Sequence, residues 1–544
     1  MPKQRVFSRC AAPLGKSLAV GHISSFQIDP NKNWYKSFMP TVWAIQFFGT
    51  ELPIFPPDTR EPLNKSTAAA GGSFAPTVRF VKNQNENYKI KFQRCFMNKI
   101  KNLPESSFLK LFFGFFTACF LIAAVCMPDR GTMFSGLWQI LSQPSKVSTN
   151  YFAVGGYAAT FLNMGLVALI CLGLYCLPGA KATNASTLAF ILTLGFGSWG
   201  INILNIWPTF LGVAIYCLVK KEKLAANVNA MLFSTGIAPL ITDLLIRYPN
   251  AEVIGFNLPG LGVALIVGFA IGFFLPAGLA ASPKIHKGFD LYSAALPIGM
   301  TAFFLQAVLF KTMGVTLPAA PAAETLQVAS RLTANVFCCV LFGACIVFAF
   351  ILGCRPKDYW RLLRDPALVT NFSSTYGNAT FLMNVGVFGL FILAYYNAIG
   401  ATFNGVTFGI IFCMLATCNS GSHPGNVWPI MLGYVVASTV FGWLSTLAGG
   451  TFTGAVNAQA ICVGLCYANG LSPIADKYGW RYGFIAAVMH YLLVTSVPNL
   501  HGGYCLYNGG FTAALICIIL VPELERFCKT KEERALSKAN NASL

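Results

Sequence analysis

The sequence predicts an all-α polytopic membrane protein, with about 14 transmembrane helices arranged as two inverted seven-helix repeats. Three observations lead to this fold class. Of the 544 residues, 55% are hydrophobic and only 10% are charged, and the mean hydropathy is +0.60. Apolar runs of about 20 residues, the length that crosses a bilayer, recur between residues 107 and 522. Several short motifs also occur twice in the same order, which indicates an internal duplication.

The duplicated motifs lie 215 to 234 residues apart in the chain. Each pair keeps its place in the order: Ala159–Leu162 with Ala379–Leu382, Asn205–Pro208 with Asn426–Pro429, Val228–Ala230 with Val456–Ala458, Gly236–Pro239 with Gly470–Pro473, and His286–Tyr292 with His501–Tyr507. One match of this length would mean little, but five in the same order indicate two copies of one ancestral unit. An apolar chain made of two repeats is typical of transporters that hold a solute between them.

The apolar runs predict 14 spans. They lie near 107–127, 151–177, 185–204, 207–220, 225–246, 257–279, 290–314, 331–353, 373–397, 404–420, 427–446, 453–471, 480–498 and 505–522. The fourth is too short to cross ~30 Å of hydrocarbon at ~1.5 Å per residue. We therefore interpret it as a half-helix or as the continuation of a broken third span. The duplication predicts a second break near the tenth and eleventh spans.

The positions of basic residues predict the orientation. With the N-terminus in the cytoplasm, the short loops on that side hold twelve Lys and Arg residues, and the opposite loops hold five. This bias is the one expected of cytoplasmic loops, and it places both termini in the cytoplasm, or on the matrix or stromal side in an organelle. Corresponding spans lie seven apart, an odd number, so the two repeats are expected to insert in opposite orientations.

We expect five segments along the chain. They are a basic tail (1–105), a first repeat (106–317), a linker (318–328), a second repeat (329–522) and a charged cytoplasmic tail (523–544). The first tail holds fifteen basic and six acidic residues, and its residues 89–101 form either an interfacial helix or a plain linker. Its first 28 residues contain no acid, as in an organellar transit peptide, but a basic cytosolic tail has the same composition. The membrane is accordingly an organelle inner membrane or the plasma membrane.

The repeated Asn-x-Trp-Pro motif gives the candidate binding site. Proline fits the first turn of a helix, and glycine and serine precede each copy, so we expect a helix to break at depth and a new one to start at Pro208 or Pro429. A helix N-terminus offers free N–H groups to anionic or electron-rich solutes. An ordinary turn outside the membrane is the alternative. The candidate substrate-binding residues are Asn163, Asn205, Trp207, Asn384, His423, Asn426 and Trp428.

Two further groups of polar residues are candidates for gating and coupling. His286, Tyr292, His501 and Tyr507 open the last span of each repeat, where they line two entrances or anchor the helices at the interface. Asp243, Asp476 and His490 fall within or near spans, where ionisable residues are functional by default, although the two aspartates fit helix ends equally well. Asp476 stands as the repeat equivalent of Asp243. The absence of Glu from mid-span positions favours a neutral or anionic solute, or passive conduction.

No enzyme signature is present in the sequence. Most of the eighteen cysteines are scattered through apolar runs, without a CxxC pair or zinc-ligand spacing. We expect no catalytic residue, no metal site and no cofactor, and we expect the cysteines to pack as small apolar side chains. Nucleic acid is the poorer explanation of the net charge of +19, because basic residues in membrane proteins usually face anionic lipid.

Two motifs carry a family resemblance. The segments Gly425–Tyr434 and His501–Phe511 resemble a family of bacterial multi-pass membrane proteins called domain of unknown function 1576 (DUF1576), over roughly residues 107–522. The resemblance implies a polytopic membrane protein and assigns no substrate and no site residues. The predicted arrangement of seven plus seven spans with breaks also looks like that of nucleobase and sulfate transporters, at the level of fold only.

The sequence favours a transporter or channel for a small polar or anionic solute, with a central site between the repeats. The first alternative is a non-transporting scaffold or accessory subunit of a larger membrane complex. The second is a membrane-embedded lipid enzyme, which would need His423, His490 or His501 beside an acid. The expected partners are the lipid bilayer, the solute, and further copies of the chain or other membrane subunits.

Overall fold

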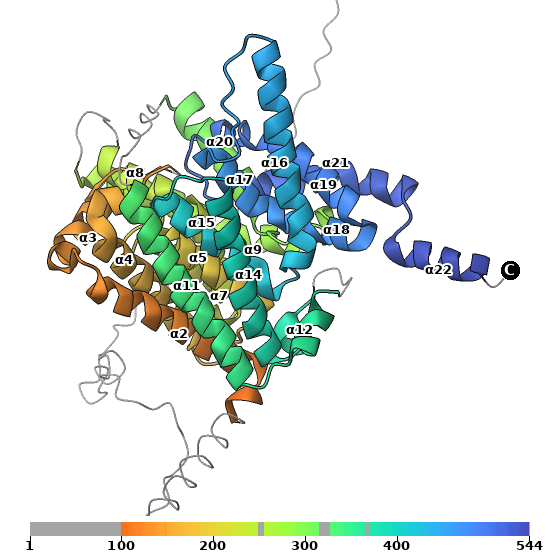
Figure 1. Cartoon of the computed structure of the whole chain (residues 1–544). Helices are drawn as coiled ribbons and strands as arrows, with labels where there is room; N and C mark the ends of the chain where they lie inside the picture. The colour runs from red at the N-terminus through yellow and green to blue at the C-terminus, as the bar shows by residue number, and fades with distance from the viewer. Residues whose placement is uncertain (1–98, 147, 249–254, 315–326, 365–369, 543–544) are drawn as a thin grey trace, which may run out of the picture. The chain divides into compact units, whose positions relative to one another are not determined.

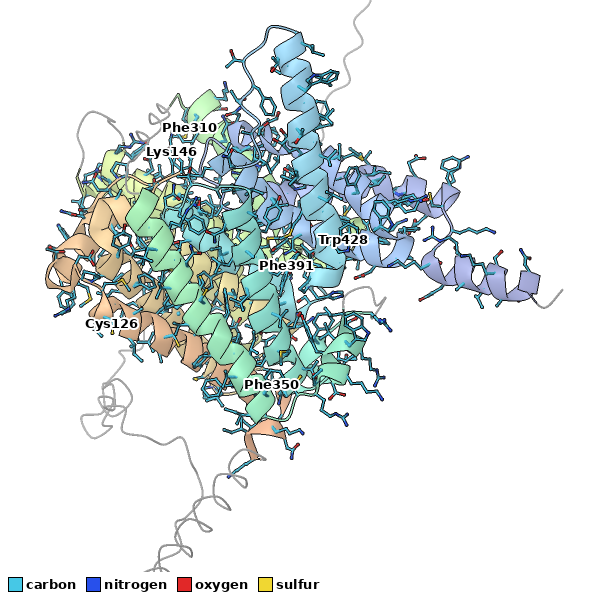
Figure 2. All side chains as sticks on the ribbon, in the orientation of Figure 1. Cys126, Lys146, Phe310, Phe350, Phe391 and Trp428 are labelled. Atoms are coloured by element: carbon cyan, nitrogen blue, oxygen red, sulfur yellow. The ribbon has the colours of Figure 1, made fainter. Side chains whose placement is uncertain are left out.

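The structure is a computed structural model that describes residues 99–146, 148–248, 255–314, 327–364 and 370–542. Most of the N-terminal tail, including the predicted transit peptide and most of segment 89–101, and most of linker 318–328 lie outside these ranges. Within them, every regular element is a helix, in agreement with the predicted all-α class (Figure 1). Figure 2 adds the side chains in the same view.

We define the first half of the chain as residues 106–317, and its described residues form nine α-helices. They are α2 (Glu105–Cys126), α3 (Met133–Ser142), α4 (Tyr151–Tyr175), α5 (Asn184–Phe196), α6 (Trp207–Lys220), α7 (Val228–Ser234), α8 (Ala238–Arg247), α9 (Leu258–Ile285) and α10 (Ala295–Gln306). A π-helical turn, Ala307–Thr312, continues α10.

Eleven α-helices lie in the described residues of the second half, residues 329–522 with the helix ends at its borders. Its helices are α11 (Gln327–Ile351), α12 (Pro356–Leu362), α13 (Phe372–Thr375), α14 (Asn378–Ala398), α15 (Gly405–Leu415), α16 (Pro424–Leu447), α17 (Gln459–Ala468), α18 (Ser472–Tyr478), α19 (Trp480–Val494), α20 (Val497–Leu500) and α21 (Asn508–Phe527). The helix α22 (Lys531–Ala542) follows in the charged C-terminal tail.

Eight helical segments in the described ranges are long and apolar enough to cross a membrane. They are Glu105–Cys126, Tyr151–Tyr175, Val228–Arg247, Leu258–Ile285, Ala295–Thr312, Ser330–Ile351, Asn378–Ala398 and Pro424–Leu447. Three shorter apolar helices accompany them, Asn184–Phe196, Trp207–Lys220 and Gly405–Asn419. These helices define an integral membrane protein. The total of 14 spans stays a prediction.

Equivalent helices pack in equivalent pairs in the two halves. Helix α2 packs on α4 as α11 packs on α14, and α6 packs on α9 as α16 packs on α19. Between the halves, α5 packs on α15 and α10 packs on α21. Each of these two contacts joins a helix to its own counterpart. The correspondence therefore extends from the sequence motifs to the packing.

One predicted helix start is wrong in the second half. Helix α6 begins at Trp207 with Pro208 in its first turn, as expected. Helix α16, however, begins at Pro424, and Pro429 lies inside it. The His423 side chain caps the helix by accepting from the Gly425 N–H, and the missing N–H of Pro424 costs nothing in a first turn.

One further helix break was not predicted, and another falls at the end of a predicted span. The 3₁₀ turn Thr235–Ile237, between α7 and α8, interrupts the fifth predicted span. The 3₁₀ turn Asn469–Leu471, between α17 and α18, coincides with the end of the twelfth. The twelfth also begins later than expected, at Gln459. Each turn contains the glycine of a duplicated motif, Gly236 or Gly470. The breaks therefore occupy equivalent places in the two halves.

Candidate functional site

Two equivalent asparagines hold the chain where it leaves the helix after α5 and after α15. Asn163 on α4 donates both amide hydrogens, to the Gly197 and Ile201 carbonyls at 2.7 and 2.9 Å. Asn384 on α14, 221 residues later, donates to the Cys418 and Ser422 carbonyls at 2.8 and 3.0 Å. Both side chains are completely buried. Their donors are therefore committed to backbone carbonyls that the helix breaks would otherwise leave unpaired.

A second equivalent pair holds the other side of each break. Asn205 donates to the Gly200 carbonyl and to Thr242 Oγ1, both at 2.9 Å. Asn426 donates to the Gly421 carbonyl at 2.8 Å and to Asp476 Oδ2 at 2.6 Å. The amide oxygens accept from the backbone N–H three residues earlier, that of Asn202 and that of His423.

The hydrogen bonds correct one assignment made from the sequence. Asp476 occupies the place of Thr242, because both accept from the equivalent asparagine. Asp243, proposed as its counterpart, instead forms an ion pair with Arg247 one helical turn later at 2.5 Å. The sequence-based pairing of Asp243 with Asp476 was wrong by one residue. The adjacent glycine-proline motifs lie 234 residues apart, and this offset pairs Thr242 with Asp476 and Asp243 with Lys477.

Two predicted binding residues lie on the outside of the molecule. Trp207 is 52% exposed and Trp428 is 40% exposed, and Trp428 is labelled on α16 in Figure 2. The Trp207 indole donates to the Ile203 carbonyl one turn earlier, and the Trp428 ring lies 5.9 Å from that of Trp480. Both indoles suit lipid-facing or interfacial positions. We therefore leave them out of the interior site.

The central contact between the halves is made by α5 and α15. Ser198, after the end of α5, donates to the carbonyl of Gly405 at the start of α15 (2.7 Å). Asn419, after the end of α15, donates to Thr187 near the start of α5 (3.2 Å). Since the end of each helix meets the start of the other, these equivalent helices run antiparallel. Gly195 and Gly409 allow the close approach, because a Cβ on either would lie within 2.7 Å of backbone oxygen of the other helix.

A reciprocal pair of hydrogen bonds joins the halves at the two 3₁₀ turns. The Leu291 N–H donates to the Gly470 carbonyl at 3.1 Å, and the equivalent Leu506 N–H donates to the Gly236 carbonyl at 2.8 Å. Each tyrosine that follows lies against the same glycine of the opposite half. A Cβ on Gly470 would be 2.6 Å from the Tyr292 ring, and one on Gly236 would be 2.4 Å from the Tyr507 ring.

The two tyrosines end in different surroundings. Tyr292 donates to the Cys413 carbonyl at 2.9 Å and accepts from Asn469 at 3.1 Å. The Tyr507 hydroxyl has no hydrogen bond within the described part of the chain, and its ring lies 5.3 Å from that of Phe196.

Asn469 connects Tyr292 to further buried polar side chains. It donates to Thr417 at 2.9 Å and accepts from Ser422 at 2.7 Å, and Ser422 lies 3.3 Å from Ser472. We call Tyr292, Thr417, Ser422, Asn469 and Ser472 the central polar network, and all five are completely buried. The equivalent of Tyr292 is Tyr507 in the second half. The equivalents of the other four lie in the first half and are less polar: Phe196, Ile201, Thr235 and Ala238. The central polar network therefore belongs to the second break, although Tyr292 reaches it from the first half.

The predicted gating histidines are buried as well. His286 and His501 are 2% and 1% exposed. His286 Nε2 lies 2.8 Å from Ser293 Oγ, and His501 Nδ1 bonds to Asn508 Oδ1 seven residues later. Burial lowers the pKa of His286, which lies between the candidate spans, to about 4. Together with Tyr292 and Tyr507, these residues fix the segments before α10 and α21 inside the protein.

Predicted coupling residue His490 links three helices of the second half. Its Nδ1 lies 2.6 Å from the Tyr434 hydroxyl on α16, and its Nε2 lies 2.8 Å from the Gly509 carbonyl on α21. Because a carbonyl only accepts, Nε2 donates and Nδ1 accepts from the tyrosine. This arrangement holds a neutral imidazole with both nitrogens occupied.

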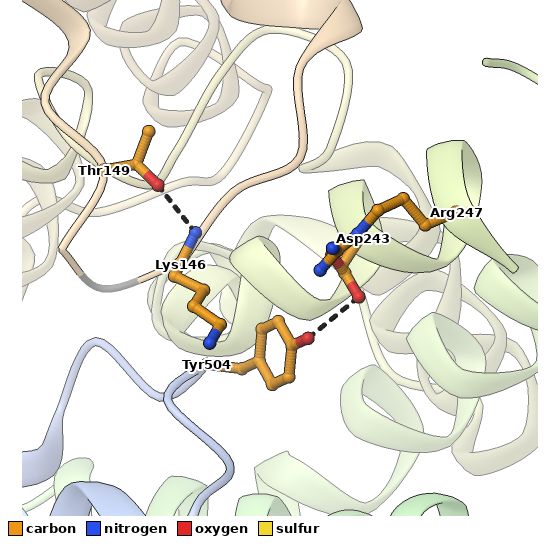
Figure 3. A network of polar contacts seen from close by, with 5 residues as sticks. All are labelled: Lys146, Thr149, Asp243, Arg247 and Tyr504. Atoms are coloured by element: carbon orange, nitrogen blue, oxygen red, sulfur yellow. Dashed lines mark hydrogen bonds and ion pairs between the residues drawn. The ribbon is translucent and has the colours of Figure 1, made fainter. Parts of the chain in front are cut away.

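Asp243 belongs to a charged cluster near the loop between α3 and α4. Besides Arg247, it accepts from the Tyr504 hydroxyl of the second half at 2.8 Å, as Figure 3 shows. Lys146 lies close enough to act electrostatically on both Asp243 and Arg247, and burial lowers the pKa of Lys146. Two cations and one carboxylate leave this cluster with a net positive charge.

Three buried polar side chains accompany that cluster. Ser145 and Asn202 face the Tyr151 hydroxyl, and all three residues are at most 2% exposed. Within the described ranges, Ser145 Oγ, Tyr151 Oη and Asn202 Nδ2 have no hydrogen bond of good geometry. This group could not be recognised from the sequence. Ser145 lies in a short loop, and only the fold brings that loop close to Asn202.

A second missed residue is Asp290. It lies between α9 and α10, where the predicted seventh span begins, but α10 itself starts only at Ala295. The carboxyl is 2% exposed. Its sequence signal was its position two residues before Tyr292, inside a duplicated motif whose second copy has Cys505 instead.

Two apolar cavities lie along α2. One, of about 410 Å³, runs between α2 and α11 and includes Cys126, Leu332 and Val336, with Cys126 labelled in Figure 2. The other, of about 250 Å³, includes Phe108, Phe348 and Leu382. Neither is lined by a residue of the predicted binding site. In the described part of the chain, no group of three or more His, Cys, Asp or Glu residues is placed to hold a metal ion.

The fold defines the class as an all-helical, polytopic integral membrane protein. The chain belongs to the family described as protein of unknown function (DUF1576), whose sequence profile matches residues 129–311 and 356–526. The two matched stretches fall on the two halves, and the family is the one that the sequence motifs indicated. No curated protein and no solved structure matches the chain.

Proposed function

We propose that this protein is a membrane transporter for a small polar or anionic solute, built from two inverted repeats that together cross the bilayer 14 times. Both termini lie in the cytoplasm or its organellar counterpart, and no enzymatic step is part of the proposal. The halves rock against each other around the contact between α5 and α15.

The antiparallel packing of α5 and α15 supports the inverted arrangement. These helices occupy equivalent places in the two halves, so an in-plane pseudo-two-fold axis between them would reverse one relative to the other. The reciprocal bonds from Leu291 to Gly470 and from Leu506 to Gly236 fit the same axis, because each half donates one backbone hydrogen bond to the other and accepts the equivalent one. Short helices and non-helical turns at depth are tolerated only inside protein or along a cavity.

The central polar network is the observation that carries the proposal. Buried polar side chains in a membrane protein are costly unless paired, and they commonly mark the path of a solute or ion. Here they gather at a helix break, between the halves, around Asn469. Their mutual hydrogen bonds close the centre in this structure. Solute passage therefore requires the segment that carries Tyr292 to separate from the break at Gly470.

The positive cluster at Lys146 and Arg247 supports an anionic or electron-rich solute. With the N-terminus in the cytoplasm, both cations face the opposite side of the membrane. Cationic groups at the mouth of a site raise the local concentration of anions. The buried donors on Ser145, Tyr151 and Asn202 provide hydrogen bonds to such a solute on its way to the centre.

Flux measurements in proteoliposomes test this proposal. We expect the purified protein to carry at least one of a panel of labelled inorganic anions, carboxylates and nucleobases, and Tyr292→Phe to reduce that flux at least tenfold. Trp207→Phe and Trp428→Phe serve as controls and should retain flux, because these indoles lie outside the interior. Absence of flux for the whole panel, with protein that is folded and inserted, would overturn the proposal.

The closed centre favours one other candidate, a non-transporting scaffold or accessory subunit. Every member of the central polar network is satisfied by another member or by backbone, as in a purely structural core. Native mass spectrometry of gently solubilised membranes separates the candidates. A stoichiometric complex with another membrane protein, together with no flux, would support the scaffold.

A further inference from the structure

Asp290 holds a buried carboxyl group that no cation in the described part of the chain neutralises. One oxygen, Oδ1, accepts from the Tyr292 N–H at 2.9 Å. The other, Oδ2, has no hydrogen bond within the described part of the chain. The residue is 2% exposed and lies on the segment 286–294, between the candidate spans Leu258–Ile285 and Ala295–Thr312.

The groups around this carboxyl are neutral or engaged elsewhere. On its own segment, His286 Nδ1 accepts from the Asp290 N–H at 3.3 Å. On α21, the Cys517 thiol lies close enough to interact with it. On α18, the Lys477 ammonium lies over the Phe289 ring, 5.1 Å from its centroid.

The remaining charged groups of the neighbourhood are paired with other partners. On α18, Asp476 accepts from Asn426, and on α21, Glu525 pairs with the exposed Lys287. None of these charged groups is paired with Asp290.

A carboxylate in such a place is costly, because it loses hydration and gains only one hydrogen bond. The group avoids the cost by taking up a proton. Burial, opposed only by the Tyr292 N–H, raises the pKa of Asp290 to about 7. The carboxyl therefore changes charge within the range of cellular pH, whereas Cys505 stands at the equivalent place of the other half.

The carboxyl also touches the contact that must open for transport. A Cβ on Gly470 would be 2.8 Å from Asp290 Oδ1 and 2.6 Å from the Tyr292 ring. The next residue, Leu291, donates to the Gly470 carbonyl. The carboxyl group and the helix break are therefore held together by a close approach that only glycine permits, with the peptide dipole of Gly470 beside the acid.

We propose that Asp290 is a proton-binding site, and that its charge state controls the contact between segment 286–294 and the helix break at Gly470. The neutral acid stays buried against Gly470 and keeps the halves closed. Release of the proton to water leaves a carboxylate that needs hydration, which draws the segment away from the break. The coupling of this step to solute flux rests on the proposed transport function, whereas proton binding itself does not.

Infrared difference spectroscopy tests proton binding without any solute. Purified protein moved from pH 8 to pH 5 should gain the C=O band of a protonated buried carboxyl, and Asp290→Asn should remove that band. Asp243→Asn is the matched control and should keep it, since Asp243 is paired with Arg247. A band that persists in Asp290→Asn, or that never appears, overturns the inference. If Asp290→Asn does not fold, Asp290→Cys, the residue of the other half, takes its place.

Flux measurements then test the coupling. With a transported solute, the wild-type rate should change at least fivefold between pH 5.5 and pH 8, and Asp290→Asn should make it independent of pH. Flux that keeps its full pH dependence in Asp290→Asn sinks the coupling while leaving transport intact. If the carboxyl band appears but no solute shows flux, the proton-binding site is supported and the transport proposal fails.

Discussion

Asn426 and Asp476 form a 2.6 Å hydrogen bond inside the second half, at the place where Asn205 and Thr242 form a 2.9 Å bond in the first half. The asparagine is the same in both halves and the acceptor is not. In both halves, therefore, an asparagine amide at the helix break donates a hydrogen bond to a later helix of the same half. Only the second half has an acidic acceptor at that place.

The acceptor can be tested by exchange between the halves. Asp476→Thr should fold with a stability within about 1 kcal/mol of the wild type, because threonine accepts from asparagine in the first half. Asp476→Leu should lose about 1–3 kcal/mol, since it leaves the buried Asn426 donor unpaired. Thermal unfolding in detergent measures both. Equal losses for the two variants would show that the bond has no structural role.

The two equivalent tyrosines should respond differently to loss of the hydroxyl. Tyr292→Phe removes a group with hydrogen bonds to Cys413, Cys466 and Asn469, so we expect a loss of about 1–3 kcal/mol. Tyr507→Phe should be nearly neutral or slightly stabilising, because its hydroxyl has no partner in the described part of the chain. The comparison uses the same substitution in both halves, and a larger effect at Tyr507 would contradict it.

Gly470→Ala should weaken the contact between the halves. Its methyl group would lie 2.6 Å from the Tyr292 ring, and overpacking of this kind typically costs about 1–3 kcal/mol. Gly262→Ala is the control, since no atom lies within 4 Å of its added Cβ and alanine suits a helix such as α9. Limited proteolysis and thermal unfolding should both report the difference, and an unchanged Gly470→Ala protein would count against the contact.

The pH dependence of stability should change in Asp290→Asn. With its pKa raised to about 7, the carboxyl binds its proton more tightly in the folded protein than in the unfolded chain. Its contribution to stability is fully present below about pH 4 and is lost as the pH rises through about 7. The variant should therefore match the wild type below about pH 4 and melt higher at pH 8. A stability difference that does not vary with pH would argue against this titration.

His286→Gln should show the opposite dependence. Burial lowers the pKa of His286 to about 4, so the folded protein resists its protonation. The contribution of His286 to stability is present above about pH 6.5 and is lost as the pH falls towards 4. Glutamine cannot take up the proton, so the variant should outlast the wild type at pH 4.5 and lose that advantage at pH 7.5. Melting curves at the two pH values decide the matter.

Much of the helical framework could be predicted from local sequence. Apolar runs such as 107–127 and 207–220 correspond to α2 and α6 almost residue for residue, because a bilayer-length run of apolar side chains fixes where a helix is needed. The family was also recognisable from two motifs. The break inside the fifth predicted span was missed, since Gly236 resembles the packing glycines common in membrane helices.

The candidate site could be predicted only in part. Asn163, Asn205, Asn384 and Asn426 are buried at the breaks, as their duplication indicated, but their hydrogen atoms are given to the backbone. Trp207 and Trp428 share the same motif and point outward. A motif does not reveal which side of a helix faces the interior, because that depends on the neighbours it packs against.

By itself, the sequence determined that this chain is an apolar, duplicated, all-helical membrane protein. The physical reason is that the transfer of an apolar segment from water to lipid depends on the side chains of that segment alone. Only the tertiary structure decided which polar residues meet. Tyr292 reaches Asn469 across 177 residues of chain, and Asp290 lies against Gly470 across 180. Such contacts depend on the packing of whole helices between the halves, which no local pattern of residues specifies.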